Sequence, residues 1–276
     1  MYIGIAGFQM KIFSRNGCWL GVVCAAAVLT AGCASQTAQP SDTSNFTESL
    51  KSDFANWPDR IVEDSKETFL RTDNITALLL AGGASIAMHH SDADKNLAEN
   101  FRRHQAFEGF TDESLNVIGC PGTHFAATGL WYALSAEKQD ELNKERAWTM
   151  FTALSTTGLV TVGLKAIRNN DTPNGKKWAW PSGHTASSFT AASVLDEFYG
   201  PKVGIPAYAL ASLVAYRMMD TGDHWASDVV FGVTLGWVVG HTIAAKHKNL
   251  EIAGFKVLPL SLRDGSVVGI NLLRQF

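Results

Sequence analysis

The sequence predicts an all-α protein, a helical bundle that ends in a short C-terminal β-hairpin. Apolar segments of helix length follow one another from residue 61 to residue 247, and glycine or proline marks several of the breaks. Alternating β-branched patterns are scarce before residue 251. A chain of 276 residues with 46% apolar residues can bury a sizeable core, so we expect one domain with appendages. The net charge of −3, with no dense basic block, argues against a nucleic-acid partner.

Residues 1–33 resemble a bacterial export signal. Lys11 and Arg15 supply positive charge ahead of an apolar stretch at 17–29, which is short for a membrane span. The segment ends at Cys33, in a sequence that resembles the lipoprotein processing site at which the cysteine receives a lipid. Thr30 stands where leucine is usual, so ordinary signal cleavage stays open as an alternative.

A lipid on Cys33 would tether the chain to a membrane. The residues after it lack the aspartate that retains such lipoproteins in the inner membrane, which implies an outer-membrane anchor facing the periplasm. Ordinary cleavage would instead give a soluble periplasmic protein. Residues 34–60 are rich in polar side chains and are expected to form a flexible tether. Cys120 is expected to be a buried structural thiol.

Residues 61–250 form the expected helical domain. The helices are predicted at 61–71, 74–90, 95–106, 113–136, 138–166, 184–199, 203–219 and 225–247. The longest uncharged stretches, 147–164 and 229–245, only reach the lower limit for crossing a bilayer. Their polar residues, His241 among them, fit the centre of a water-soluble bundle at least as well. We therefore expect a soluble or membrane-resting domain.

The pattern changes over residues 251–276. Two apolar, β-branched segments flank Asp264 and Gly265, a dipeptide that favours a tight hairpin turn. These residues are expected to form the C-terminal β-hairpin.

The tetrapeptide Pro181-Ser182-Gly183-His184 precedes an apolar helical run. Ser182 can cap that helix, and Gly183 lets a ligand approach the backbone closely. The free N–H groups at a helix start form a site for an anion. A plain helix start with a surface histidine is the alternative for this tetrapeptide taken alone.

Farther along the chain, Arg217 is followed by His224 and Asp228. A spacing of four places the last two on one face of a helix, where the carboxylate can orient the imidazole ring and leave its other nitrogen free to attack phosphorus. A simple capping contact would use the same pair. The ordered combination of Lys165, Pro-Ser-Gly-His, Arg217 and this pair is a more specific signal than the pair alone.

This ordered set resembles the type 2 phosphatidic acid phosphatase family, which is related to bacterial nonspecific acid phosphatases and vanadium haloperoxidases. The family motifs run Lys-x6-Arg-Pro, Pro-Ser-Gly-His and Ser-Arg-x5-His-x3-Asp. The second motif is complete at 181–184, and His224-x3-Asp228 completes the end of the third. The resemblance covers about residues 145–245 and implies a helical bundle of the acid phosphatase type.

Two departures from the family pattern concern positive charge. Thr172 stands where the family has arginine, and a hydroxyl group replaces neither the charge nor the fork of a guanidinium. Arg168, one helical turn after Lys165, is a candidate to reach the site instead. In the third motif, six residues rather than five separate Arg217 from His224, and a loop around Gly222 would absorb the extra residue.

The resemblance implies a role for each matching residue. His224 would be the nucleophile that forms a phosphohistidine, Asp228 would orient it, and His184 would be the general acid for the leaving group. The remaining members share the expected role of binding phosphoryl oxygens: Lys165, Arg217, Ser182, Gly183 and, in place of the missing arginine, Arg168. No metal or cofactor is implied, because the other acids and histidines show no ligand spacing.

The predicted function is a metal-independent phosphatase that acts on phosphomonoesters or lipid (pyro)phosphates on the periplasmic side. A phosphorylated small molecule or lipid is the expected partner. The departures at Thr172 and Arg217 keep a second class open: a catalytically degraded relative that binds phospholipid or serves as a structural lipoprotein. A vanadate-dependent haloperoxidase is a third reading, because a pocket that binds phosphate also binds vanadate.

Overall fold

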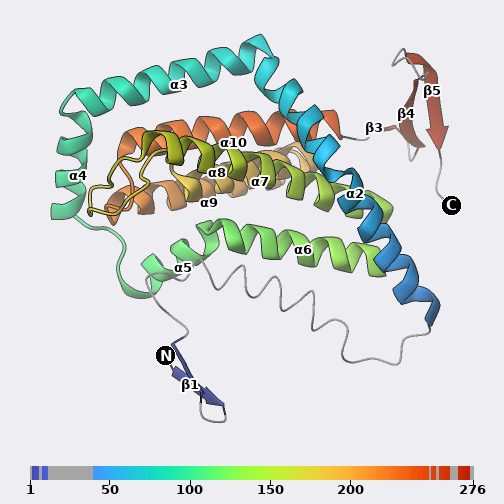
Figure 1. The fold of residues 1–276 in the computed structure, drawn as a ribbon, viewed down its shortest axis with the longest axis horizontal. Helices are drawn as coiled ribbons and strands as arrows, with labels where there is room; N and C mark the ends of the chain where they lie inside the picture. Colours follow the sequence, from blue (N-terminus) through green and yellow to red (C-terminus); the bar gives the residue numbers. More distant parts are fainter. Residues whose placement is uncertain are drawn as a thin grey trace.

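The computed structural model describes residues 2–5, 8–11, 40–248, 250–252, 255–261 and 267–273, with side chains over 47–248. The described helices run in chain order as α2 (Pro40–Leu70), α3 (Thr72–His90), α4 (Ala93–Arg103), α5 (Gly109–Gly119), α6 (Pro121–Glu137), α7 (Glu141–Arg168), α8 (Gly183–Tyr199), α9 (Pro201–Asp220) and α10 (Ala226–Lys246). Figure 1 shows α7, α8, α9 and α10 side by side, flanked by α3 and by α6. The all-α prediction is confirmed.

Two expectations about the helical bundle need correction. The helix predicted at 113–136 is two helices, because Cys120 adopts an extended backbone and Pro121 begins α6, where its missing N–H costs nothing. Cys120 is buried as expected, but it is disulfide-bonded rather than a thiol.

The polar segment expected to be a flexible tether at 34–60 is helical from Pro40 onward, as part of α2. Contacts with the bundle explain the helix. Tyr132 Oη donates a hydrogen bond to Asp53 Oδ2 at 2.6 Å, and Arg60 Nη2 donates to Glu145 Oε1 at 2.9 Å. The apolar face of α2 also places Trp57 against the cluster around Trp148. Tertiary packing thus overrides the polar composition of the segment.

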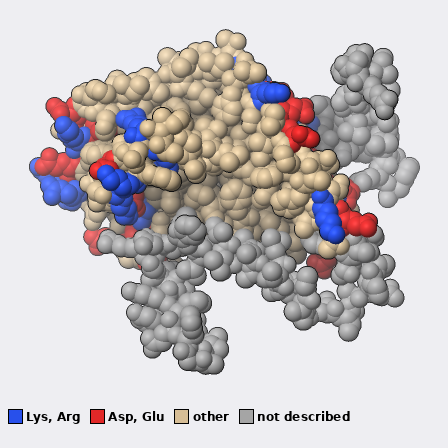
Figure 2. Space-filling view, viewed as in Figure 1, with Lys and Arg blue, Asp and Glu red and all other residues tan. Residues whose placement is uncertain are grey.

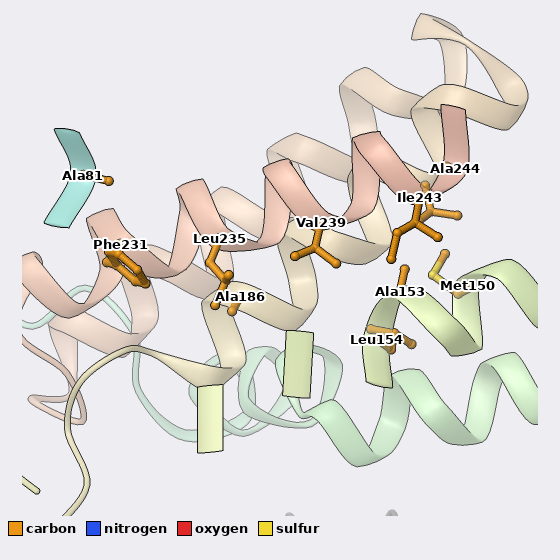
Figure 3. Close-up of a cluster of buried hydrophobic side chains, with 11 residues drawn as sticks. Ala81, Met150, Ala153, Leu154, Ala186, Phe231, Leu235, Val239, Ile243 and Ala244 are labelled. Atoms are coloured by element: carbon orange, nitrogen blue, oxygen red, sulfur yellow. The ribbon is translucent and has the colours of Figure 1, made fainter. Parts of the chain in front are cut away.

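The core lies between α7, α8 and α10, with α3 beside it. In Figure 3, Phe231, Leu235, Val239 and Ile243 follow one another along one side of α10. Their spacing of four is the period of a helix face, so this side of α10 is buried along its length.

A second face of α10 consists of glycines. A Cβ atom at Gly232 would lie 2.9 Å from the carbonyl oxygen of Ser182. At Gly236 it would lie 2.2 Å from the carbonyl oxygen of Ala186 on α8, and at Gly240 2.6 Å from that of Thr190 on α8. Real Cβ atoms do not approach so closely, and only glycine permits this contact between two helix backbones. The glycines therefore hold α8 and α10 together over several turns, which sets the geometry at their N-terminal ends.

Short strands lie at both ends of the chain. β1 (Tyr2–Ile5) pairs antiparallel with β2 (Phe8–Lys11). At the C-terminus, β4 (Phe255–Ser261) pairs antiparallel with β5 (Val267–Leu273), as expected of a hairpin, and β3 (Leu250–Ile252) adds a third strand on the β4 edge. The predicted turn at Asp264 and Gly265, the apolar stretch at 17–29 and Cys33 lie outside the described residues.

Much of the helical surface is apolar. Figure 2 shows a broad face without charge, with Lys, Arg, Asp and Glu gathered toward its ends. Large exposed side chains include Leu79, Leu80 and Ile86 on α3, Leu159, Val162 and Ile167 on α7, and Ile205 on α9. Among the described residues, α7 and α10 are long and apolar enough to cross a membrane, although a buried core helix passes the same test.

Candidate active site

The second and third motifs meet where α8 and α10 begin. The backbone N–H of Ser182 donates a hydrogen bond of 3.1 Å to the carbonyl oxygen of Asp228. Ser182 is the N-cap of α8, and its Oγ accepts a hydrogen bond from the N–H of Thr185 at 3.4 Å, as predicted. Two helix N-termini therefore lie side by side, and both favour negative charge nearby.

His224 and Asp228 form the expected pair. His224 Nδ1 lies 3.4 Å from Asp228 Oδ2, and that oxygen also accepts a hydrogen bond from the N–H of Trp225 at 2.9 Å. His224 precedes α10 rather than lying in it, and its own N–H donates to the carbonyl of Met218. With Nδ1 facing the carboxylate, Nε2 is the nitrogen available for nucleophilic attack.

The other oxygen of Asp228 has a different environment. Asp228 is fully buried, and its Oδ1 has no hydrogen-bond partner among the residues that the structure describes. Burial lowers the pKa of His224, and the hydrogen bond with Asp228 opposes this effect. The ring is therefore neutral near pH 7, which is the form that a nucleophile requires.

His184 lies in the first turn of α8, next to the pair. Burial, together with the nearby His224 and Arg217, lowers its pKa to about 3. Within the described part of the chain, its Nε2 is buried without a hydrogen-bond partner. An unpartnered ring nitrogen near His224 is available to exchange a proton with a bound ligand.

Lys165 approaches the site from the end of α7. Its Nζ donates to the carbonyl oxygens of Trp178 and Ala179, the latter at 3.1 Å. A Cβ atom on Gly183 would lie 4.0 Å from Lys165 Cε, so the lysine passes directly by the first turn of α8. Burial lowers the pKa of Lys165 to about 8, and the charge of Asp228 opposes this effect.

Arg217 lies in the last turn of α9 and is 6% exposed. Its Nε donates to Asp112 Oδ1 and its Nη1 to Asp223 Oδ2, each at 2.7 Å. The loop after α9 folds back through hydrogen bonds from Thr221 and His224 to carbonyls of α9. The charge of the guanidinium contributes to the lowered pKa of His184. A phosphate contact by Arg217 stays a prediction.

The two candidates in the first motif take other positions. The guanidinium of Arg168 lies over the ring of Trp180, 5.2 Å from its centroid, in a cation–π contact. Thr172 is buried, and its hydroxyl bonds within its own loop, donating to Asn174 Oδ1 at 2.6 Å. A phosphate contact by Arg168 stays a prediction.

Some residues at this end of the bundle were not found from the sequence. Asp94, at the start of α4, is 1% exposed and accepts hydrogen bonds from the N–H and the Oγ of Ser227, at 3.0 and 2.6 Å. His89 Nδ1 lies 3.1 Å from the same carboxylate. Asp94 thus caps the N-terminus of α10 from a distant helix, and only its tertiary position shows this role.

The site brings together a histidine paired with a buried carboxylate, a second histidine with an unpartnered ring nitrogen, and at least two cations. Among the described residues, no group of three or more His, Cys, Asp or Glu side chains could hold a metal ion. These groups fit transfer of a phosphoryl group to a histidine, with the positive charges stabilising the phosphoryl oxygens.

Comparison with known proteins agrees with the fold and the motifs. Residues 159–251 match the sequence profile of the PAP2 superfamily, and this match confirms the resemblance that the motifs indicated.

Two relatives are phosphatases by name. A lipid A 1-phosphatase of Porphyromonas gingivalis is 37% identical over 65 residues, covering 22% of this chain and 15% of that protein. A lipid A 4'-phosphatase of Helicobacter pylori is 25% identical over 96 residues, covering 35% of this chain and 48% of that protein. The chain therefore spans less than half the length of these curated relatives.

A solved structure shares the fold. The crystal structure of a transmembrane PAP2-type phosphatidylglycerolphosphate phosphatase from Bacillus subtilis aligns with a TM-score of 0.51 and 18% identity. The alignment covers 64% of this chain and 94% of that chain.

Proposed function

We propose that this chain is a phosphatase that hydrolyses phosphomonoesters or pyrophosphates of lipids through a phosphohistidine at His224. The observation that carries the proposal is the meeting of His224, Asp228 and His184 at two adjoining helix N-termini, with Lys165 and Arg217 beside them. These are the groups that phosphoryl transfer requires.

The reaction has two steps. In the first, Nε2 of His224 forms a bond to phosphorus while the bond from phosphorus to the ester oxygen breaks, and His184 donates a proton to that oxygen. In the second, water attacks the phosphohistidine, His184 takes a proton from the water, and the bond from phosphorus to nitrogen breaks. Phosphate leaves, and both histidines return to their starting states.

His184 must carry a proton for the first step, although burial and its charged neighbours lower its pKa to about 3. A phosphate group between the two histidines brings negative charge next to the ring. Opposite charge favours the protonated form and raises the pKa, so substrate binding itself supplies the acid. Protonation of His184 is then coupled to occupation of the site.

A lipid substrate is supported by two features. Apolar side chains such as Leu80, Val162 and Ile205 are exposed on several helices, which favours contact with a bilayer over a purely aqueous setting. The relatives named above are phosphatases of lipid A, an amphiphile with phosphate groups. We propose that the apolar surface of the bundle contacts lipid and that the site takes phosphate from a lipid headgroup.

The chain is proposed to face the periplasm, held by a lipid on Cys33. The support is the sequence that resembles a lipoprotein processing site. Replacing Cys33 with serine is expected to release the protein from membranes or to block its processing. Wild-type protein that is soluble in periplasmic extract would reject the anchor in favour of ordinary cleavage.

Release of inorganic phosphate from a panel of substrates tests the activity. The panel contains lipid A, phosphatidylglycerol phosphate, phosphatidic acid, an isoprenyl pyrophosphate and p-nitrophenyl phosphate, each with and without EDTA. Turnover that EDTA does not reduce is expected for at least one lipid. Failure to release phosphate from every substrate over a range of pH would reject the proposal.

One observation favours a second candidate, a degraded relative that binds phospholipid without hydrolysing it. Two carboxylates, Asp112 and Asp223, pair with Arg217. If they kept the guanidinium from phosphate, stoichiometric binding without turnover would result. The same substrate panel, combined with a binding measurement, separates the two candidates.

A further inference from the structure

We infer that Lys176 is a phosphate-binding residue that supplies the positive charge missing at Thr172. The inference rests on the proposed function and concerns the same site. Lys176 lies four residues after the position at which the related family has arginine, so the motif does not identify it. Its ammonium group donates a hydrogen bond of 2.7 Å to Asp223 Oδ1. Asp223 is the residue directly before the proposed nucleophile His224 in the chain.

Thr172 builds the turn that presents this lysine. Its N–H donates to the carbonyl of Lys176 at 2.8 Å, and its Oγ1 accepts the N–H of Lys176 at 2.9 Å. The N–H of Gly175 donates to the Thr172 carbonyl, and Gly175 has a positive φ of 81°. Both ends of the turn are thus held by one buried residue. An arginine at position 172 could not make these hydroxyl contacts.

The turn is docked against the loop before His224. The N–H of Asn174 donates to the carbonyl of Gly222 at 3.1 Å, and Asn174 Nδ2 donates to Asp223 Oδ1 at 2.8 Å. Gly222 has a φ of +68°, and a Cβ atom there would lie 3.5 Å from Pro173 Cβ. The left-handed backbone favours glycine at this position, and the Cβ distance is that of an ordinary van der Waals contact. Two loops far apart in the chain therefore form one unit.

Asp223 joins two cations at the site. One of its oxygens accepts from Lys176 Nζ, and the other accepts from Arg217 Nη1, each at 2.7 Å. The two cations are therefore separated only by the carboxylate of Asp223 and its two hydrogen bonds. Arg217 is the arginine that the third motif assigns to phosphate. A phosphoryl group bound by Arg217 can therefore place a second oxygen within reach of Lys176.

The other cations of this segment face elsewhere. Arg168 stacks over Trp180, and Lys177 pairs with Asp171 at 2.7 Å, with 70% of its side chain exposed. Among the described cations of residues 166–180, Lys176 alone bonds to a residue that also contacts Arg217. Asn174 and Asp223 are positioning residues that hold its ammonium group there.

Isothermal titration calorimetry of the purified full chain with inorganic phosphate tests this inference. The kcat/KM for a lipid phosphate is measured as well. Lys176→Ala is expected to weaken phosphate binding and lower kcat/KM by about ten- to a hundredfold, the loss of one charge-assisted hydrogen bond. Lys176→Arg should retain most of both. Lys177→Ala is the matched control, a neighbouring exposed lysine, and should equal wild type.

The phosphate-binding measurement tests this inference separately from the proposed function. If Lys176→Ala binds phosphate as tightly as Lys177→Ala does, the inference is overturned, whatever the turnover. If wild type binds phosphate through Lys176 and releases none from any substrate, the inference stands and the phosphatase proposal fails. Lys176 is more than half exposed, so its replacement should leave the fold intact, which a thermal melt verifies.

Discussion

The N–H of Ser182 donates a hydrogen bond of 3.1 Å to the carbonyl oxygen of Asp228, which joins the first turns of α8 and α10. The general acid of the proposed reaction, His184, follows Ser182 by two residues, and the nucleophile His224 precedes Asp228 by four. Their separation is set by how closely the two helices approach each other. The glycine face of α10 controls that approach, so packing deep in the bundle determines the geometry of the site.

Replacing Gly236 with alanine should damage both the fold and the activity. The new Cβ atom would lie 2.2 Å from the carbonyl oxygen of Ala186, so the helices must separate. Overpacking of this kind costs about 1–3 kcal/mol of unfolding free energy or more, and the displaced histidines should lower kcat/KM at least tenfold. Thermal melting and phosphate release measure the two effects.

Gly163→Ala is the matched control, because a Cβ atom there would meet nothing within 4 Å. Alanine in an exposed helix should stabilise the protein by up to about 1 kcal/mol relative to glycine. Equal melting temperatures for Gly236→Ala and Gly163→Ala would contradict the role assigned to the glycine face.

The alkaline limb of the pH profile should report Lys165. Burial lowers the pKa of this lysine to about 8, so its positive charge is present below pH 8 and is lost above it. Since kcat/KM reports the free enzyme, it should fall about tenfold per pH unit above this value. Lys165→Arg keeps its charge at all accessible pH values and should move the limb upward. An unchanged limb in Lys165→Arg would assign it to another group.

Thr172→Arg, which restores the family residue, should lower activity rather than raise it. Thr172 is 6% exposed, and its hydroxyl holds the turn that presents Lys176. The loss of these hydrogen bonds in a buried turn costs about 1–3 kcal/mol and should displace the lysine. Thr172→Ser keeps the hydroxyl and should behave like wild type. Higher kcat/KM in Thr172→Arg would show that the motif position still faces phosphate.

The sequence predicted those parts of the fold and the site that depend on local spacing. The apolar segments located the helices, and Ser182 caps α8 as expected. The four-residue spacing of His224 and Asp228 predicted their contact, which the structure shows at 3.4 Å, although His224 lies before α10 and not on its face. Each of these features depends on residues within a few positions of one another, where spacing determines geometry.

The remainder depends on contacts between distant segments. Asp112 and Asp223 pair with Arg217 from α5 and from the loop after α9, and Asp94 reaches Ser227 across the bundle. Sequence spacing contains no signal for such pairs. The helix at Pro40 was missed for the same reason, because contacts with α6 and α7 stabilise a segment of polar composition.

The central claim is that His224 becomes phosphorylated. Wild-type protein would be mixed with a lipid substrate carrying radiolabelled phosphate and quenched in alkali within the first turnover, since phosphohistidine survives base. The account predicts labelled protein for wild type and for a His241→Ala control, and no label for His224→Ala. The kcat/KM of His224→Ala should fall by at least about a thousandfold. Hydrolysis by His224→Ala at the wild-type rate, or label retained in that variant, would contradict the account.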